Sequence, residues 1–321
     1  MIQTSQNFVE IKNLSKHFNL GDNKFLHAVD EVTLSIANGE TLGLVGESGC
    51  GKSTLGRLLV RMYEQTSGDL YINGQKVPEK LNQSQRKKFA RDVQMVFQDP
   101  FASLNPRMTV GDIVAEGPDI PDLWRASERT ERIHFWLKRV GLRSEHASRF
   151  PHEFSGGQKQ RIGIARALAI EPKFIVCDEP ISALDVSIQA QVVNLLEDLQ
   201  NEFKLTYLFI AHGLHMVRHI SDRMAVMYLG QLVELGPSKD VFENPLHPYS
   251  EALIASNPYP DPEKERQRSH KLLVGEITSP VNPKPGCRFA ARCPIAEDRC
   301  RKVTPLLREI VPGRQVACHL R

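Results

Sequence analysis

The stretch that decides the fold is Gly46-Glu47-Ser48-Gly49-Cys50-Gly51-Lys52-Ser53-Thr54. It follows the short apolar run 41–45 and precedes the helix-like run 55–59, so a strand, a glycine-rich loop and a helix come in order. The phosphate-binding motif Gly-x-x-x-x-Gly-Lys-Ser requires this context. In such a loop the backbone N–H groups and the helix N-terminus bind phosphate oxygens, Lys52 neutralises phosphate charge and Ser53 offers a hydroxyl to Mg²⁺. The sequence therefore predicts a site for a nucleoside triphosphate and Mg²⁺.

A second chemical feature is the apolar run 174–177, which ends in Asp178 and Glu179. A carboxylate at the end of a buried strand, near a phosphate loop, is suited to hold Mg²⁺ through water, and its neighbour is suited to polarise an attacking water. We expect Asp178 in the first role and Glu179 in the second. A further glycine-rich turn, Ser155-Gly156-Gly157-Gln158, opens another helix-like run and is a second candidate anion site.

The rest of the chain divides into segments of different pattern. Alternating apolar residues predict antiparallel strands over 9–14 and 32–36, and a hairpin strand over 69–72. A helical insertion is expected from about 105 to 170, and the strands 174–177 and 207–211 flank the helix 188–202 in the order of a parallel α/β sheet. Proline becomes frequent after residue 245. We therefore expect an ATPase domain over 1–240 and a small extension over 241–321.

Charge and hydropathy narrow the class of protein. The 321 residues carry 41 Lys and Arg against 38 Asp and Glu, a net charge of +3 that gives no argument for nucleic acid as a partner. No apolar run approaches the roughly 18 residues of a membrane span, and the start of the chain lacks the basic and apolar regions of a signal peptide. We expect a chain that does not cross the membrane and faces the cytosol.

The cysteines are unevenly distributed, with four of the six in the last 35 residues: Cys287, Cys293, Cys300 and Cys318. In a cytosolic chain such a cluster indicates metal ligation before disulfides. Four thiolates satisfy either a tetrahedral Zn²⁺ or a [4Fe–4S] cluster, and the spacing alone does not choose between them.

Taken together, the phosphate loop, the Ser155-Gly156-Gly157-Gln158 turn, the Asp178-Glu179 pair and the run 182–185 resemble the motifs of ABC-type ATPases. The resemblance implies a P-loop α/β core with an antiparallel β subdomain and a helical subdomain. It also implies roles for further residues: Phe18 stacking on adenine, Gln98 contacting Mg²⁺ and water, Asp185 at the nucleotide interface and His212 sensing the γ-phosphate. Phe154 and Gly213 depart from the family pattern, which usually has Leu and Asp there.

Three stretches, 43–59, 96–107 and 244–249, look like the ATPases of oligopeptide and dipeptide importers, and more like their F-type than their D-type subunit. That resemblance implies a heterodimer with a sister ATPase subunit. It implies two transmembrane permease subunits above the pair, an extracytoplasmic solute-binding protein, and a peripheral location on the cytoplasmic face of the inner membrane. Some members carry a [4Fe–4S] cluster in the same extension, which favours iron and sulfur over zinc. Phe101, Leu104 and Met108 lie among turn residues, so we expect them to be exposed, and in the family this region forms the groove for a permease helix; the alternative is that they fill the insertion's own core.

Three alternatives stay open at this point. The solute could be nickel or a sugar instead of a peptide, because selectivity lies in other subunits. The chain could be an ABC ATPase acting on DNA or the ribosome, although its single phosphate loop and short helical insertion are not typical of that class. Finally, it could bind ATP without hydrolysing it. Glu179 and His212 argue against that reading, whereas Gly213 keeps it possible.

Overall fold

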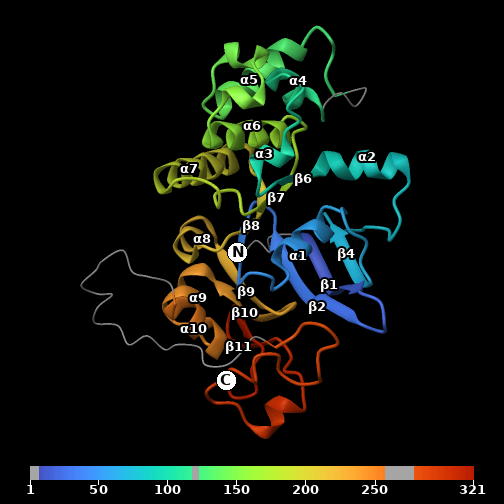
Figure 1. Ribbon diagram of the computed structural model, residues 1–321, viewed down its shortest axis with the longest axis vertical. Helices are drawn as coiled ribbons and strands as arrows, with labels where there is room; N and C mark the ends of the chain where they lie inside the picture. Colours follow the sequence, from blue (N-terminus) through green and yellow to red (C-terminus); the bar gives the residue numbers. More distant parts are fainter. Residues whose placement is uncertain (1–6, 118–122, 257–277) are drawn as a thin grey trace, which may run out of the picture. The chain divides into compact units, whose positions relative to one another are not determined.

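The computed structural model describes residues 7–117, 123–256 and 278–321 (Figure 1). The described residues form two compact units: unit 1 contains 7–8, 36–40, 78–117 and 123–211, and unit 2 contains 9–35, 41–77, 212–256 and 278–321. Part of the predicted helical insertion (118–122) and part of the predicted extension (257–277) lie outside the described residues. The domain boundary near residue 240 stays a prediction.

An antiparallel sheet in unit 2 contains the strands that the alternating pattern predicted. Its spatial order is β2-β1-β4-β5, with Val9 of β1 opposite Ile72 of β4. Asn73 and Gly74 have φ values of 48° and 73°, the left-handed pair that a tight two-residue hairpin needs. The strands are longer than predicted: β1 (Asn7–Asn19), β2 (Phe25–Ala37), β4 (Ser67–Ile72) and β5 (Gln75–Lys76).

A second set of strands in unit 2 begins with β3 (Thr41–Val45), all five residues of which are buried. β3 is parallel to β9 (Arg223–Tyr228), and β9 is antiparallel to β10 (Gln231–Pro237). The C-terminal part then extends the sheet, because β12 (Arg314–Val316) pairs with β10 and with β11 (Arg308–Val311). The helices of this unit are α1 (Lys52–Leu59), α8 (Leu214–Ile220), α9 (Ser238–Glu243) and α10 (Pro248–Ala255), with a 3₁₀ turn over Asp298–Arg301.

Unit 1 is the α/β part with the helical insertion. Its strands β6 (Val93–Val96), β7 (Phe174–Asp178) and β8 (Thr206–Ile210) are parallel, with β7 between the other two. Figure 1 shows α3 to α6 gathered in one cluster. Trp136 and Leu137 are buried within it, as the helical spacing predicted. The helices are α2 (Gln83–Asp92), α3 (Pro100–Ser103), α4 (Val110–Ala115), α5 (Arg129–Arg139), α6 (Gly156–Leu168) and α7 (Val186–Phe203), with 3₁₀ turns over Ser144–Ser148 and Pro151–Glu153.

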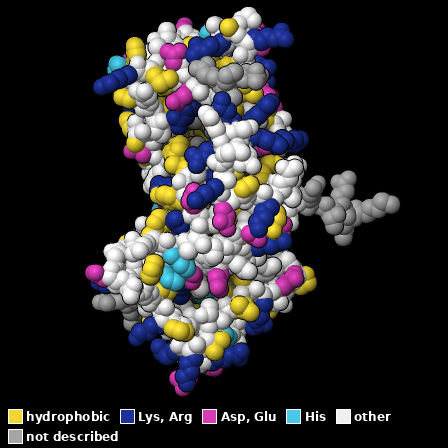
Figure 2. All heavy atoms as spheres, turned by 90° about the vertical axis from the view of Figure 1, so that its right-hand side faces the viewer, with side chains coloured by type: hydrophobic (Ala, Val, Ile, Leu, Met, Phe, Trp, Pro, Cys, Tyr) yellow, Lys and Arg dark blue, Asp and Glu magenta, His cyan; other side chains and the backbone are white. Residues whose placement is uncertain are grey.

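The described surface agrees with the modest net charge. On the face drawn in Figure 2, Lys and Arg side chains are interspersed with Asp and Glu side chains. Within the described ranges, none of the helices combines the length and the apolar character needed to span a bilayer.

Candidate nucleotide site

The phosphate loop of unit 2 depends on glycines in conformations that other residues rarely adopt. Gly46 and Gly51 have φ values of 154° and 108°. A Cβ atom on Gly46 would lie 2.2 Å from the carbonyl oxygen of Met227, and one on Gly51 would lie 2.0 Å from that of Ala28. These positions therefore exclude any side chain, and the loop leads directly into α1 at Lys52.

Lys52 is 4% exposed and its ammonium donates to the carbonyl oxygens of Gly46, at 2.8 Å, and Glu47, at 3.0 Å. The charge thus lies inside the curve of the loop, where phosphate oxygens would be neutralised. Cys50 is buried, and burial raises the pKa of its thiol despite the nearby Lys52. Its thiol is therefore suited to packing and not to redox chemistry.

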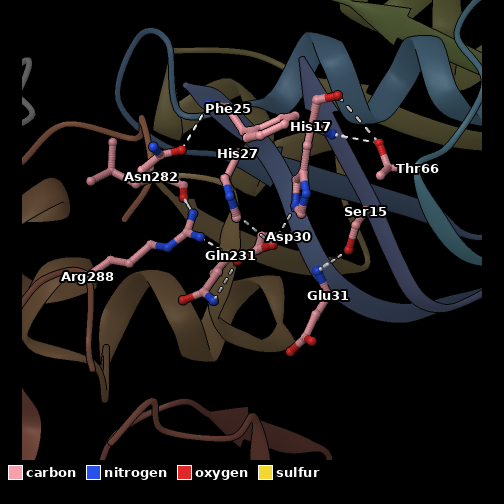
Figure 3. A network of polar contacts seen from close by, with 11 residues as sticks. Ser15, His17, Phe25, His27, Asp30, Glu31, Thr66, Gln231, Asn282 and Arg288 are labelled. Carbon is pink, nitrogen blue, oxygen red and sulfur yellow. Dashed lines mark hydrogen bonds and ion pairs between the residues drawn. The ribbon is translucent and has the colours of Figure 1, made fainter. Parts of the chain in front are cut away.

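Phe18 lies on β1 and is half-buried, with Tyr63 packed edge-on at 5.5 Å between ring centroids. The Lys16 ammonium lies 5.0 Å from the centroid of the same ring, so a stacked base would have to share the ring with Lys16 or displace it. The neighbouring His17 faces a polar network in which His17 Nε2 and His27 Nδ1 lie 2.7 and 3.2 Å from the same oxygen of Asp30 (Figure 3). Arg288 of the C-terminal part pairs with the other Asp30 oxygen.

The carboxylate pair belongs to unit 1, where Asp178 ends β7 and is 1% exposed. Glu179 is 6% exposed and has φ 48°, a left-handed conformation that turns the chain sharply at the end of the strand. The side-chain amide of Gln98 donates to the Glu179 carboxylate at 2.6 Å. The structure therefore brings together Gln98 and Glu179, two residues that the family resemblance singled out.

The glycine-rich turn at Ser155 is a helix start, as predicted. The Ser155 hydroxyl accepts from the backbone N–H of Gln158 at 3.4 Å, and the Gln158 side chain accepts from the Ser155 N–H at 3.0 Å. This reciprocal capping fixes the first turn of α6. Asp185 begins α7 from an exposed position. In unit 2, the exposed His212 comes just before Gly213, the residue that caps α8.

The four C-terminal thiols line one pocket of unit 2 together with His247 and Phe289. Burial, together with the neighbouring thiols, raises the pKa of Cys287 to about 11 and also raises that of Cys293. The thiolate forms of Cys287 and Cys293 are consequently disfavoured until a cation stabilises them.

One exposure prediction is wrong. Phe101 is 58% exposed and Met108 is partly exposed, but Leu104 is buried at 3% exposure. Leu104 ends the short helix α3, which packs on α6, and Arg166 of α6 donates to the carbonyl of Ser103. Leu104 therefore belongs to the core of the helical cluster. The exposed Phe101 instead makes a cation–π contact, with the Lys159 ammonium 3.9 Å from the centroid of its ring.

Sequence comparisons agree with the motifs. An ABC transporter family model matches residues 29–182, and an oligopeptide/dipeptide transporter C-terminal region model matches 233–300. The putative oligopeptide transport ATP-binding protein YkfD of Bacillus subtilis is 55% identical over 97% of this chain and 95% of its own length. The oligopeptide transport ATP-binding protein OppF of Escherichia coli is 52% identical over 93% of this chain and 92% of its own length.

Solved structures give the same fold. A dimeric ATP-binding cassette in a post-hydrolysis state, bound to ADP and Pi, matches with a TM-score of 0.65 and 30% identity. The match covers 72% of this chain and 98% of the cassette. These similarities confirm the predicted fold and family. The chain belongs to the ATP-binding proteins of the oligopeptide and dipeptide ABC transporters.

Proposed function

We propose that this chain hydrolyses ATP to power the import of di- or oligopeptides through a membrane complex. The observation that carries the proposal is the phosphate loop with its buried lysine, in a chain about half identical to named peptide-transport ATPases over nearly its full length. The loop supports nucleotide binding, and the named relatives support peptides as the class of solute that is transported.

The residues receive individual roles. The loop formed by residues 46–54 binds the phosphates of ATP, with Lys52 on the β- and γ-phosphates, Ser53 on Mg²⁺ and Glu47 in a supporting position, since its N–H donates to Tyr249. Asp178 holds Mg²⁺ through water, and Glu179 polarises the attacking water, with Gln98 orienting its carboxylate at 2.6 Å. His212 senses the γ-phosphate and Phe18 stacks on adenine.

The second half of each ATP site would come from the sister ATPase subunit. Ser155-Gly156-Gly157-Gln158 begins a capped helix whose N-terminus is available for an anion. Asp185 and Val186, which we also assign to the interface between the subunits, are exposed, Val186 by 76%. We infer a head-to-tail pair in which this turn closes on the partner's nucleotide. ATP binding closes the pair and hydrolysis reopens it. Two permease subunits would hold the pair at the cytoplasmic face of the membrane, fed by an extracytoplasmic binding protein.

The thiol pocket is the candidate metal centre. Its four cysteines line one pocket with His247 and Phe289, and four thiolates satisfy either a tetrahedral Zn²⁺ or a [4Fe–4S] cluster. The resemblance of this extension to that of the peptide importers, some of which carry a [4Fe–4S] cluster, favours the cluster over Zn²⁺. Cys287, Cys293, Cys300 and Cys318 would hold it, and the bound cluster would cross-link the C-terminal part.

The test is transport by the intact complex. The chain is purified in detergent with the subunits that accompany it, reconstituted into vesicles, and supplied with ATP and radiolabelled dipeptide, nickel or sugar. We expect ATP-dependent uptake of the peptide alone. Uptake of nickel or sugar instead would replace the peptide, and a complex containing DNA or ribosomal components without permeases would overturn the transport role.

A further inference from the structure

Glu47, the second residue of the phosphate loop, is fixed at each of its polar groups. Its backbone N–H donates to the Tyr249 hydroxyl at 2.8 Å, and its carbonyl accepts from Lys52 at 3.0 Å. Its carboxylate accepts from Arg292 Nη1, which is 3.1 Å from both oxygens. Two of these three partners lie more than 200 residues further along the chain, in the segment matched by the transporter C-terminal model.

These two partners are themselves held firmly. Tyr249 is fully buried and packs against Tyr228 and Phe289, with ring centroids 4.5 and 5.5 Å away. The Arg292 side chain is 8% exposed, and its guanidinium also reaches the Tyr228 hydroxyl at 3.4 Å. A buried tyrosine and a buried arginine lose little further freedom on pairing with Glu47, so they can fix the loop before a ligand arrives.

The charge of Glu47 gives the arginine a second effect. A carboxylate in a phosphate-binding loop repels a triphosphate, and because the Glu47 side chain is 24% exposed, solvent screens that repulsion only in part. Arg292 cancels that charge. The hydroxyl of Tyr249 accepts from the Glu47 N–H and so anchors the start of the loop.

We infer that Arg292 and Tyr249 are positioning residues for nucleotide binding: the C-terminal part presets the phosphate loop by neutralising and anchoring Glu47. The inference rests on the proposed ATP site. It gives the C-terminal part a direct effect on nucleotide affinity, beyond its contribution to folding.

The experiment measures the dissociation constants of Mg-ATP and Mg-ADP for the full-length chain by titration calorimetry. We expect Arg292→Met to weaken Mg-ATP binding by roughly tenfold, a typical size for coupling between linked groups, and to weaken Mg-ADP binding less. Tyr249→Phe weakens both nucleotides, because the anchor is lost without a change in charge. Arg321→Met is the matched control, since Arg321 forms an exposed ion pair with Glu251 in the same C-terminal part and should bind nucleotide as wild type does.

A double variant separates positioning from folding. Glu47→Gln combined with Arg292→Met removes both charges, so it should bind Mg-ATP more tightly than Arg292→Met alone, and Arg292→Lys should restore part of the affinity. If Arg292→Met binds both nucleotides as wild type does, or if the double variant is as weak as the single one, the inference is wrong. A wild-type chain that binds no nucleotide would instead overturn the proposed ATP site. Thermal unfolding without nucleotide identifies any variant that fails to fold, in which case Arg292→Lys and Tyr249→Phe carry the test.

Discussion

The side-chain amide of Gln98 donates to the carboxylate of Glu179 across 2.6 Å, joining the end of β6 to the end of β7 within one unit. Glu179 is 6% exposed, so its carboxylate has few water molecules to hold its orientation. The amide therefore fixes the direction of the group that we propose polarises the attacking water.

Gln98→Ala removes this hydrogen bond. We expect kcat for ATP hydrolysis to fall by roughly tenfold, the equivalent of about 1.5 kcal/mol for one hydrogen bond to a charged group, with KM nearly unchanged. Steady-state ATPase assays of the assembled complex measure both constants. Gln94→Ala is the control, since Gln94 lies on β6, just before Gln98, and its side-chain amide donates to the backbone carbonyl of Ala90. An unchanged kcat would show that Gln98 does not contribute to catalysis.

Phe101 is the apolar residue that we propose contacts a permease helix. Phe101→Asp should reduce co-purification of the permease subunits and peptide-stimulated ATPase activity, because a charge replaces an apolar contact. Leu20→Asp is a matched control, since Leu20 is 55% exposed and Phe101 58%. Normal assembly and coupling in Phe101→Asp would refute the docking role.

The network of Figure 3 makes stability depend on pH. Burial lowers the pKa of His27 below its usual 6.5, aided by His17 and Arg288 and opposed by its hydrogen bond to Asp30. The unfolded chain therefore binds the proton more readily than the folded chain. The neutral His27 side chain therefore stabilises the fold fully above pH 6.5, and this stabilisation is lost as pH falls through that value towards the lower pKa of the folded state.

For Asp30, burial alone would raise the pKa, but Arg288 and the two histidines together lower it below 3.8. Asp30 thus stabilises the fold above pH 3.8 and ceases to do so as pH falls through its lower folded pKa. Urea unfolding between pH 5 and 7.5 should show a shallower rise in stability with pH for His27→Gln than for wild type. The exposed His219→Gln is the control, and equal slopes for wild type and His27→Gln would contradict the expectation.

The thiol pocket predicts a bound cluster in anaerobically purified protein. We expect a broad absorption shoulder near 400 nm, with iron and acid-labile sulfide on the order of four each per chain. Cys293→Ser should lose most of both. Stoichiometric zinc without iron would change the choice of metal, and metal-free protein whose Cys293→Ser variant folds and transports normally would remove the site.

Much of the fold follows from local patterns. The phosphate loop and the 174–178 strand could be predicted because glycine, lysine and carboxylate at fixed spacings have a direct chemical purpose. α2 was not predicted, since it is strongly polar and buries no residue. β9 and β10 were missed because nearly all their residues are buried, which removes the alternation typical of strands.

Contacts between residues far apart in the sequence could not be predicted from local sequence patterns. Glu47 meets Arg292 across 245 positions, and nothing in the spacing of either residue indicates the other. Leu104 was predicted to be exposed because it lies among turn residues, yet tertiary packing of α3 on α6 buries it. Packing of this kind overrides the tendency of turn-rich sequence to be exposed.

Glu179 is the residue that we propose polarises the water that attacks bound ATP. The direct measurement is the ATPase rate of Glu179→Gln beside wild type, each assembled with the sister subunit, together with ATP binding by each. We predict that Glu179→Gln binds ATP and holds the pair closed but hydrolyses it roughly 10²-fold or more slowly, the usual contribution of a general base. Lys52→Ala, by contrast, should bind ATP weakly. Hydrolysis by Glu179→Gln at the wild-type rate would contradict the account.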